Sequence, residues 1–288
     1  MKVLFCTDGS KISFNALHNF SKWAPENTLV DTICVIDWSF LPDDAVIESE
    51  GFSISCANIA DNILDYAKRE VEKYELLFGE KIKHCGSAIE CIIEQAQKEH
   101  YDIILMGSHG KKGIQKWLGS VSREIAYNEN ISTYISKEEN GKMRVLFATD
   151  GTESANIAVT KALENLNLDG KEIYLCTVNE TPDTLFLDGT LDSNWILAIE
   201  EQQEKYSYST LNELRERFKT KGYEPLDAII LSGNPAQKII DFAKSRQIDL
   251  IVLGSKGKTK MQDFLLGSVS KRVLENTTSD VLIFKDIV

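Results

Sequence analysis

Residues 249–275 read DLIVLGSKGKTKMQDFLLGSVSKRVLE, and this stretch decides the fold. Its apolar run, residues 250–253, ends at Gly254, which is typical of a parallel strand covered by helices on both faces. The pair Gly267-Ser268 precedes a helical pattern, so we expect a helix with Ser268 as its N-cap. A helix N-terminus offers N–H groups and partial positive charge, which suit phosphate. The stretch therefore predicts a nucleotide phosphate site at the carboxyl end of a strand, where open α/β sheets bind ligands.

The chain contains this kind of unit twice. KVLFCTDGS at residues 2–10 matches RVLFATDGT at 144–152, and the later glycines correspond as well. Each half alternates strands with helical segments, which implies βαβ units with right-handed crossovers. We therefore predict an α/β chain of two tandem, doubly wound, open parallel-sheet domains of Rossmann-like type, each with about five strands. The domains are expected over residues 1–139 and 143–288, with a short polar linker between them.

The long helices and the last strands are expected at corresponding places in the two halves. We expect a charged helix at residues 59–78 and its counterpart at 195–221. The fifth strands are expected at 131–136 and 281–284, close to the domain boundaries.

The composition narrows the class of protein. The chain has 288 residues, of which 43% are hydrophobic and 26% charged, as in ordinary globular proteins. Its net charge of −12 argues against nucleic acid or an anionic membrane as the main partner. No apolar run approaches a membrane span and the start reads as a strand, so we expect a cytoplasmic protein. The six cysteines form no CxxC pair, which indicates reduced and mostly buried thiols.

The spacing Gly254-x2-Gly257-x9-Gly267-Ser268, downstream of a strand that ends in Asp150-Gly151, resembles the ATP-binding signature of the universal stress protein family. The resemblance covers nearly the whole chain as two family units. It implies an adenine nucleotide alpha-hydrolase-like fold and a regulatory protein of the stress response that binds ATP, with Mg²⁺ as an optional companion of the phosphates. Family members pair through their last strands, so the resemblance also implies an intrachain pseudo-dimer, with a homodimer left open.

The resemblance assigns site residues in the second half. The adenine and ribose would lie against residues of three strand ends, with Asp150 on the adenine side and Val178 packed on the base: Ala148, Thr149, Asp150, Val178, Leu253 and Gly254. The phosphates would accept hydrogen bonds from backbone N–H groups of the glycine loop: Gly257, Gly267, Ser268 and Val269. Without that loop, Asp150-Gly151 would be interpreted as a strand-to-helix turn with the Asp as a cap.

The first half carries a second, weaker version of the site. Its matching residues are Asp8, Val35, Gly107, Gly110, Gly119 and Ser120. Eight residues separate Gly110 from Gly119, whereas nine separate Gly257 from Gly267. One residue fewer displaces backbone donors by about 3 Å, roughly the length of a hydrogen bond. We therefore predict that the second half binds ATP and that the first half binds it weakly or not at all.

Two other functions stay open. One is a slow ATPase or phosphotransferase on the same fold, for which Ser255, Thr259 and Ser268 are the nearby candidates. The other is a chaperone-like module that binds partners and keeps only vestigial nucleotide sites. A P-loop is not favoured, because its leading glycine would fall at Val252 inside the strand. No catalytic constellation or metal-ligand spacing is visible, so neither catalytic residues nor metal ligands are predicted.

Overall fold

The structure is a computed structural model that describes residues 1–37, 50–109, 118–127, 132–137, 141–180, 193–256 and 266–285. The side chains of residues 50–57, 193, 194 and 196 are not described. The chain divides into two compact units. The first is built mainly from Met1–Glu139, and the second mainly from Asn140–Glu164 and Leu168–Asp286.

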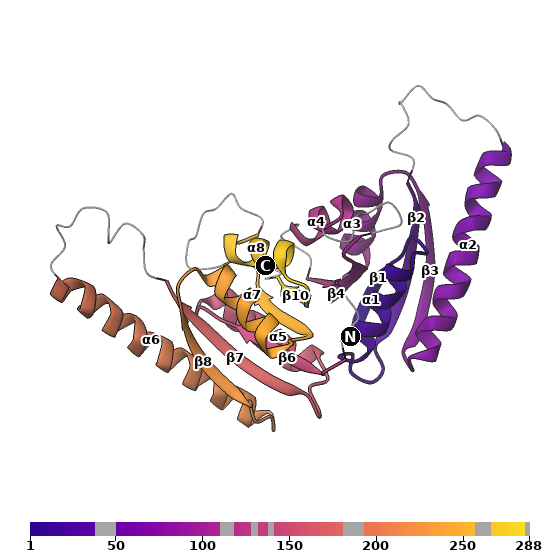
Figure 1. The fold of residues 1–288 in the computed structure, drawn as a ribbon. Coiled ribbons are helices and arrows are strands. Elements are labelled where there is room, and N and C mark those ends of the chain that lie inside the picture. Colours follow the sequence, from indigo (N-terminus) through magenta and orange to yellow (C-terminus); the bar gives the residue numbers. More distant parts are fainter. Residues whose placement is uncertain are drawn as a thin grey trace. The chain divides into compact units, whose positions relative to one another are not determined.

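The first unit is a parallel sheet with helices on both faces (Figure 1). Its strands lie in the order β3-β2-β1-β4-β5, and every printed pairing between them is parallel. The strands are β1 Lys2–Cys6, β2 Leu29–Ile36, β3 Leu77–Cys85, β4 Ile103–Gly107 and β5 Thr133–Ser136. The helices are α1 Lys11–Ser21, α2 Glu50–Lys73, α3 Ala88–Glu99 and α4 Ser120–Tyr127. Helix α1 packs on α2, and α3 packs on α4.

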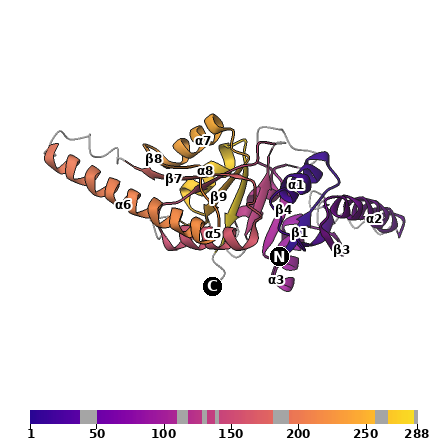
Figure 2. The ribbon, with the colours of Figure 1, turned by 90° about the horizontal axis from the view of Figure 1, so that it is seen from below.

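The second unit repeats this architecture. Its parallel sheet has the order β10-β9-β6-β7-β8. The strands are β6 Arg144–Ala148, β7 Glu172–Asn179, β8 Asp227–Ser232, β9 Leu250–Gly254 and β10 Asp280–Phe284. The helices are α5 Glu153–Asn165, α6 Ser193–Thr220, α7 Pro235–Arg246 and α8 Ser268–Asn276. Figure 2 shows α5 and α6 on one face of this sheet and α7 on the other.

The predicted α/β class with two doubly wound parallel sheets is therefore confirmed. In the second unit the chain leaves β6 toward β7 and β8, and then returns to the other side of β6 to form β9. The boundary between β6 and β9 is thus the point at which the strand order reverses. Ligands of open α/β sheets bind at such a point, outside the carboxyl ends of the strands.

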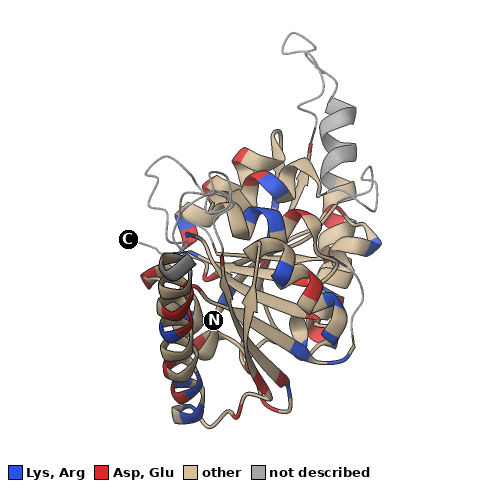
Figure 3. Ribbon diagram, turned by 60° about the vertical axis from the view of Figure 1, so that its left-hand side comes forward, with Lys and Arg blue, Asp and Glu red and all other residues tan. Residues whose placement is uncertain are grey.

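The hydrophobic pattern explains which strands are central. Leu146 and Phe147 of β6 and Ile251 of β9 are fully buried. Continuous apolar runs of this kind belong to strands covered on both faces. Acidic and basic residues are instead interspersed along the helices (Figure 3). Within the described ranges, no helix combines the length and the apolar character that crossing a bilayer requires.

Both bounds predicted for one long helix are wrong. The helix expected at residues 59–78 begins at Glu50 and ends at Lys73, and the strand β3 already starts at Leu77. The backbone of Glu75 takes a left-handed conformation, with φ of 59°, which cannot continue a right-handed helix. The Leu77 N–H then donates to the Thr28 carbonyl oxygen at 2.9 Å, so the chain joins the sheet there.

Gly254 marks a close approach between β9 and the first turn of α5. A Cβ atom at Gly254 would lie 3.0 Å from the backbone N of Ala155 and from the backbone C and O of Ser154. Backbone atoms cannot move aside as the end of a flexible side chain can. The absence of a side chain at Gly254 therefore sets how closely β9 and α5 pack.

We predict that Gly254→Val destabilises the protein, because the added side chain forces β9 away from α5. The expected loss in unfolding free energy is about 1–3 kcal/mol, the usual cost of overpacking a core. Urea-induced unfolding measures it. Gly141→Ala is the matched control, since its added Cβ meets no atom within 4 Å, and it should shift stability by less than about 0.5 kcal/mol. Equal stability of Gly254→Val and the wild type would contradict the prediction.

Candidate functional site

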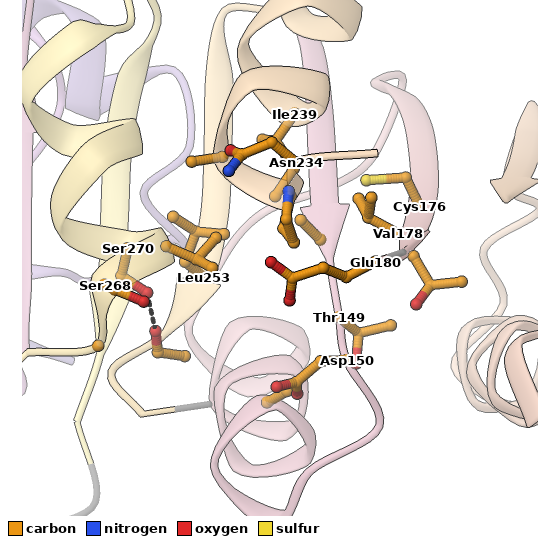
Figure 4. Close-up of a pocket in the computed structure, with 18 of the residues that line it drawn as sticks. Thr149, Asp150, Cys176, Val178, Glu180, Asn234, Ile239, Leu253, Ser268 and Ser270 are labelled. Atoms are coloured by element: carbon orange, nitrogen blue, oxygen red, sulfur yellow. Dashed lines mark hydrogen bonds between the residues drawn. The ribbon is translucent and has the colours of Figure 1, made fainter. Parts of the chain in front are cut away.

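A cavity of about 1210 Å³ lies at the carboxyl ends of β6, β7 and β9 in the second unit (Figure 4). The N-termini of α7 and α8 contribute to its lining, and so do residues of α6. Typical small-molecule sites occupy about 300–1,000 Å³, so the cavity has room for a ligand of nucleotide size. The position matches the topological switch point of the sheet.

Nine of the ten residues predicted for the stronger site line this one cavity. They are Ala148, Thr149, Asp150, Val178, Leu253, Gly254, Gly267, Ser268 and Val269. The tenth, Gly257, lies outside the described residues. Segments separated by more than a hundred positions in the sequence thus meet at one edge of the sheet.

One end of the cavity has apolar walls. Val178 comes from the end of β7 and Ile239 from the first turns of α7, whereas Leu253 of β9 lies nearer to Ser268 and Ser270 (Figure 4). Cys176 also lines this end, and burial raises the pKa of its thiol to about 12. The thiol therefore stays protonated at neutral pH and acts as an uncharged wall. Such walls suit the faces of an aromatic base.

Asp150 lies in the turn that joins β6 to α5. Its Oδ1 accepts hydrogen bonds from the backbone N of Thr152 at 3.0 Å and from Thr152 Oγ1 at 2.6 Å. Gly151 follows with a φ of 76°, a backbone conformation that favours glycine. In the structure, Asp150-Gly151 therefore forms a turn from strand to helix, and Asp150 accepts hydrogen bonds within that turn. One carboxylate oxygen serves the turn, and neither bond uses the other, Oδ2.

The opposite end of the cavity is the N-terminus of α8. The N-cap is Gly267 and not Ser268, so the predicted cap is wrong by one residue. No side chain accepts a hydrogen bond at this cap. The N–H groups in the first turn of a helix have no partner within the helix, so they remain directed at the cavity end.

Two hydrogen bonds attach α8 to β9. The Gly267 N–H donates to the Ser255 carbonyl oxygen at 2.7 Å, and Ser270 Oγ donates to the Gly254 carbonyl oxygen at 2.8 Å. Three cationic side chains line the same part of the cavity: Lys256, Lys271 and Arg272. This end therefore combines a helix N-terminus with positive side chains, both of which favour an anion.

Several lining residues were not found by sequence reasoning. They are mostly polar and come from the end of β7, from α6 and from the start of α7: Asn179, Glu180, Gln202, Gln203, Tyr206, Ser207 and Asn234. Asn234-Pro235 carried a readable signal, because Asn is a common N-cap and Pro a common first helical residue. The α6 residues carried none, since their place at the cavity depends on tertiary packing alone.

The first unit has the same framework around its predicted weaker site. Asp8 follows β1, Val35 lies in β2, and Gly107 ends β4. The Gly119 N–H donates to the Ser108 carbonyl oxygen at 2.7 Å, and Ser122 Oγ donates to the Gly107 carbonyl oxygen at 2.7 Å. Ser120 is the first residue of α4, whereas Gly110 lies outside the described residues. The loop between Ser108 and Gly119 is one residue shorter than its counterpart, and the hydrogen bonds that hold its two ends are the same as in the second unit.

The side chain after Ser108 distinguishes the two units. His109 is buried, with 7% of its surface exposed, whereas its counterpart Lys256 is exposed. His109 Nδ1 lies 3.0 Å from Ser108 Oγ, and its Nε2 has no hydrogen-bond partner among the described residues. Burial, followed by the positive charge of Lys137, lowers the pKa of His109, and Asp8 opposes this shift.

The fold and the cavity define the class: an open α/β protein that carries, at a sheet switch point, a crevice with an apolar end and a cationic end. The comparison with protein families is more specific. The chain belongs to the universal stress protein family, whose family model matches residues 1–137 and again residues 142–285. The predicted family is therefore confirmed, with two family units in one chain.

Individual relatives agree with this assignment. A universal stress protein of Methanocaldococcus jannaschii is 29% identical over 156 residues, which are 54% of this chain and 89% of the relative. One from Synechocystis is 21% identical over 226 residues, 77% of this chain and 71% of the relative. The crystal structure of one from Archaeoglobus fulgidus has a TM-score of 0.69 and 22% identity, and covers 99% of this chain and 96% of its own. At that identity the last comparison supports the fold.

We predict that His109 makes the protein less stable at acidic pH. The pKa of His109 in the folded state lies below its value of about 6.5 in an unfolded chain. The unfolded state therefore binds a proton first as the pH falls, and stability is lost between neutral pH and the lowered pKa. His109→Gln should reduce the drop in unfolding free energy between pH 7 and pH 5. His84→Gln, at an exposed position on β3, should retain the wild-type drop, and identical profiles for all three proteins would contradict the prediction.

Proposed function

We propose that the second unit binds ATP and that its occupancy regulates contacts with other proteins during the stress response. The observation that carries the proposal is the two-ended crevice, with apolar walls at one end and the N-terminus of α8 at the other. Membership of the universal stress protein family supports a role in the stress response. The protein would act in the cytoplasm as a regulator whose bound nucleotide changes its surface.

The apolar end would hold the adenine ring. Val178 would pack against the base, with Ala148 and Thr149 at its edge, and Leu253 would line the channel toward the phosphates. The Oδ2 atom of Asp150 would be available to a ribose hydroxyl or a base amine, because Thr152 bonds only to Oδ1. Gly254 would leave the channel between base and phosphates narrow but open, since no side chain projects from it.

The cationic end would hold the phosphates. Backbone N–H groups of Ser268 and Val269 would donate to phosphate oxygens, as helix N-termini commonly do. Lys256, Lys271 and Arg272 would neutralise the remaining charge. In the described part of the chain, no three His, Cys, Asp or Glu side chains are grouped to hold a metal ion. A Mg²⁺ ion that accompanied ATP would therefore be bound by phosphates and water.

The first unit would bind ATP more weakly. Its loop between Gly110 and Gly119 is one residue shorter, and the buried His109 replaces the exposed Lys256. A buried imidazole with a lowered pKa is neutral at pH 7, so it supplies no positive charge to a phosphate. The pairing of the two units as a pseudo-dimer, and the oligomeric state, stay predictions from the family resemblance.

We predict that Ser268→Asp abolishes tight ATP binding and leaves the fold intact. An Asp in the first turn of α8 is favourable for the helix, because its charge complements the helix dipole. The same charge repels a phosphate at that place. Wild-type protein at a hundredfold excess of ATP over the dissociation constant should gain about 2.7 kcal/mol of stability, whereas the variant should gain almost none. Calorimetric titration and thermal unfolding with and without ATP measure both quantities.

The matched control for this variant is Ser120→Asp, at the first position of α4 in the first unit. It places the same charge on the corresponding helix and should leave the tight ATP site unchanged. If ATP binding survives Ser268→Asp but is lost in Ser120→Asp, the tight site lies in the first unit and the prediction is wrong. Wild-type protein that neither binds ATP nor is stabilised by it would favour the alternative of a partner-binding module with vestigial sites.

We also predict about one tightly bound ATP per chain. The shorter loop and the neutral His109 would offer phosphate fewer well-placed donors in the first unit, so its affinity should be at least tenfold lower. Equilibrium dialysis with radiolabelled ATP gives the stoichiometry. Two equal tight sites would refute the asymmetry, and release of labelled phosphate in the same samples would support the ATPase alternative.

A further inference from the structure

We propose that Glu180 determines which base the crevice accepts, by requiring an exocyclic amine on the purine. This inference rests on the proposed function, since it concerns the same nucleotide site. Glu180 immediately follows β7 and lines the cavity beside Asn179. The spacing patterns that revealed the strands and glycines gave no indication of it.

The backbone at Glu180 is held from two sides. Gln203 Nε2, on α6, donates a hydrogen bond to the Glu180 carbonyl oxygen at 3.0 Å. The Gly233 N–H donates to the carbonyl oxygen of the neighbouring Asn179 at 3.0 Å. Ser207 Oγ, also on α6, donates to Asn179 Oδ1. The position of Glu180 at the crevice is therefore fixed by both α6 and the β8–α7 turn.

The side chain of Glu180 points into the crevice. Figure 4 shows its carboxylate between Asn234 on one side and Thr149 and Asp150 on the other. Among the described residues, none donates a hydrogen bond to this carboxylate or forms an ion pair with it. A carboxylate without a protein partner at the apolar end is ready to accept hydrogen bonds from a ligand.

Two neighbouring polar side chains at this end each use one oxygen atom in hydrogen bonds within the protein. Asp150 Oδ1 accepts two hydrogen bonds from Thr152, and Asn234 Oδ1 accepts one from the backbone N of Gln237 at 3.2 Å. These bonds belong to the turn before α5 and to the N-cap of α7. Glu180 therefore remains as the charged acceptor at this end with both oxygens unengaged by the described residues.

The chemistry of a carboxylate gives the selection. An ionised carboxylate only accepts hydrogen bonds, so it binds an amino group on the base. A base with a carbonyl oxygen in that place would direct its lone pairs at the negative charge. The charged acceptor would then be left without a donor, which is the strongest way in which a site rejects an analogue. Adenine carries the amine, and hypoxanthine carries the oxygen in its place.

The test compares the binding of ATP and inosine triphosphate by titration calorimetry. Wild-type protein should bind ATP at least about tenfold more tightly, the usual size of one hydrogen bond to a charged group. Glu180→Gln should reduce this ratio at least about fivefold, because an amide both donates and accepts and is therefore tolerant of either base. The variant should also gain affinity for inosine triphosphate relative to the wild type.

The matched control is Glu201→Gln, which removes the same charge from an exposed position on α6 outside the cavity lining. It should keep the wild-type ratio. If wild-type protein binds both nucleotides equally, or if Glu180→Gln keeps the wild-type preference, the role of Glu180 is overturned and ATP binding stands. If wild-type protein binds neither nucleotide, both the role of Glu180 and the proposed function fail. Thermal unfolding without nucleotide shows that each variant is folded.

Discussion

The crevice of the second unit depends on the attachment of α8 to the carboxyl end of β9. Ser270 Oγ bonds to the Gly254 carbonyl oxygen, and the Gly267 N–H bonds to the Ser255 carbonyl oxygen. These bonds hold the N-terminus of α8 beside the strand end whatever path the intervening loop takes. On the other side of β9, Gly254 brings the strand against the first turn of α5. The anion-attracting end of the crevice is thus set by backbone geometry more than by any single charged side chain.

The same attachments exist in the first unit, where Ser122 and Gly119 make the equivalent bonds to β4. The two units therefore share the hydrogen bonds that hold the helix to the strand end, and they differ in the side chains at that end. Lys256 is exposed at the crevice of the second unit, whereas His109 is buried in the first. The substitution exchanges a solvated cation for an imidazole that burial and Lys137 keep neutral. A duplicated fold can in this way retain its framework while its two copies present different side chains at corresponding places.

The sequence predicted the features that arise from local pattern. The apolar runs of β6 and β9, the repeated Asp-Gly turns and the glycine pairs follow directly from hydrophobic periodicity and backbone preference. The sequence did not predict the features that depend on packing. The end of α2 depends on the left-handed backbone of Glu75, and the place of Tyr206 in the crevice depends on how α6 lies on β7. Gly267 replaces Ser268 as the N-cap because the bond to Ser255 fixes the entry of the chain into α8.

The distribution of charge along the crevice restricts what can bind there and in which direction. Figure 4 shows Glu180 and Asp150 away from Ser268 and Ser270. Lys256 lies just after β9, and Lys271 and Arg272 belong to α8. An anion at the first end would face two carboxylates, and a group rich in donors at the other end would face cations and N–H groups. A ligand that satisfies both ends must therefore carry hydrogen-bond donors on an apolar ring at one extremity and negative charge at the other. The nucleotide proposed above, with its amino-substituted base, would meet this requirement in one orientation only.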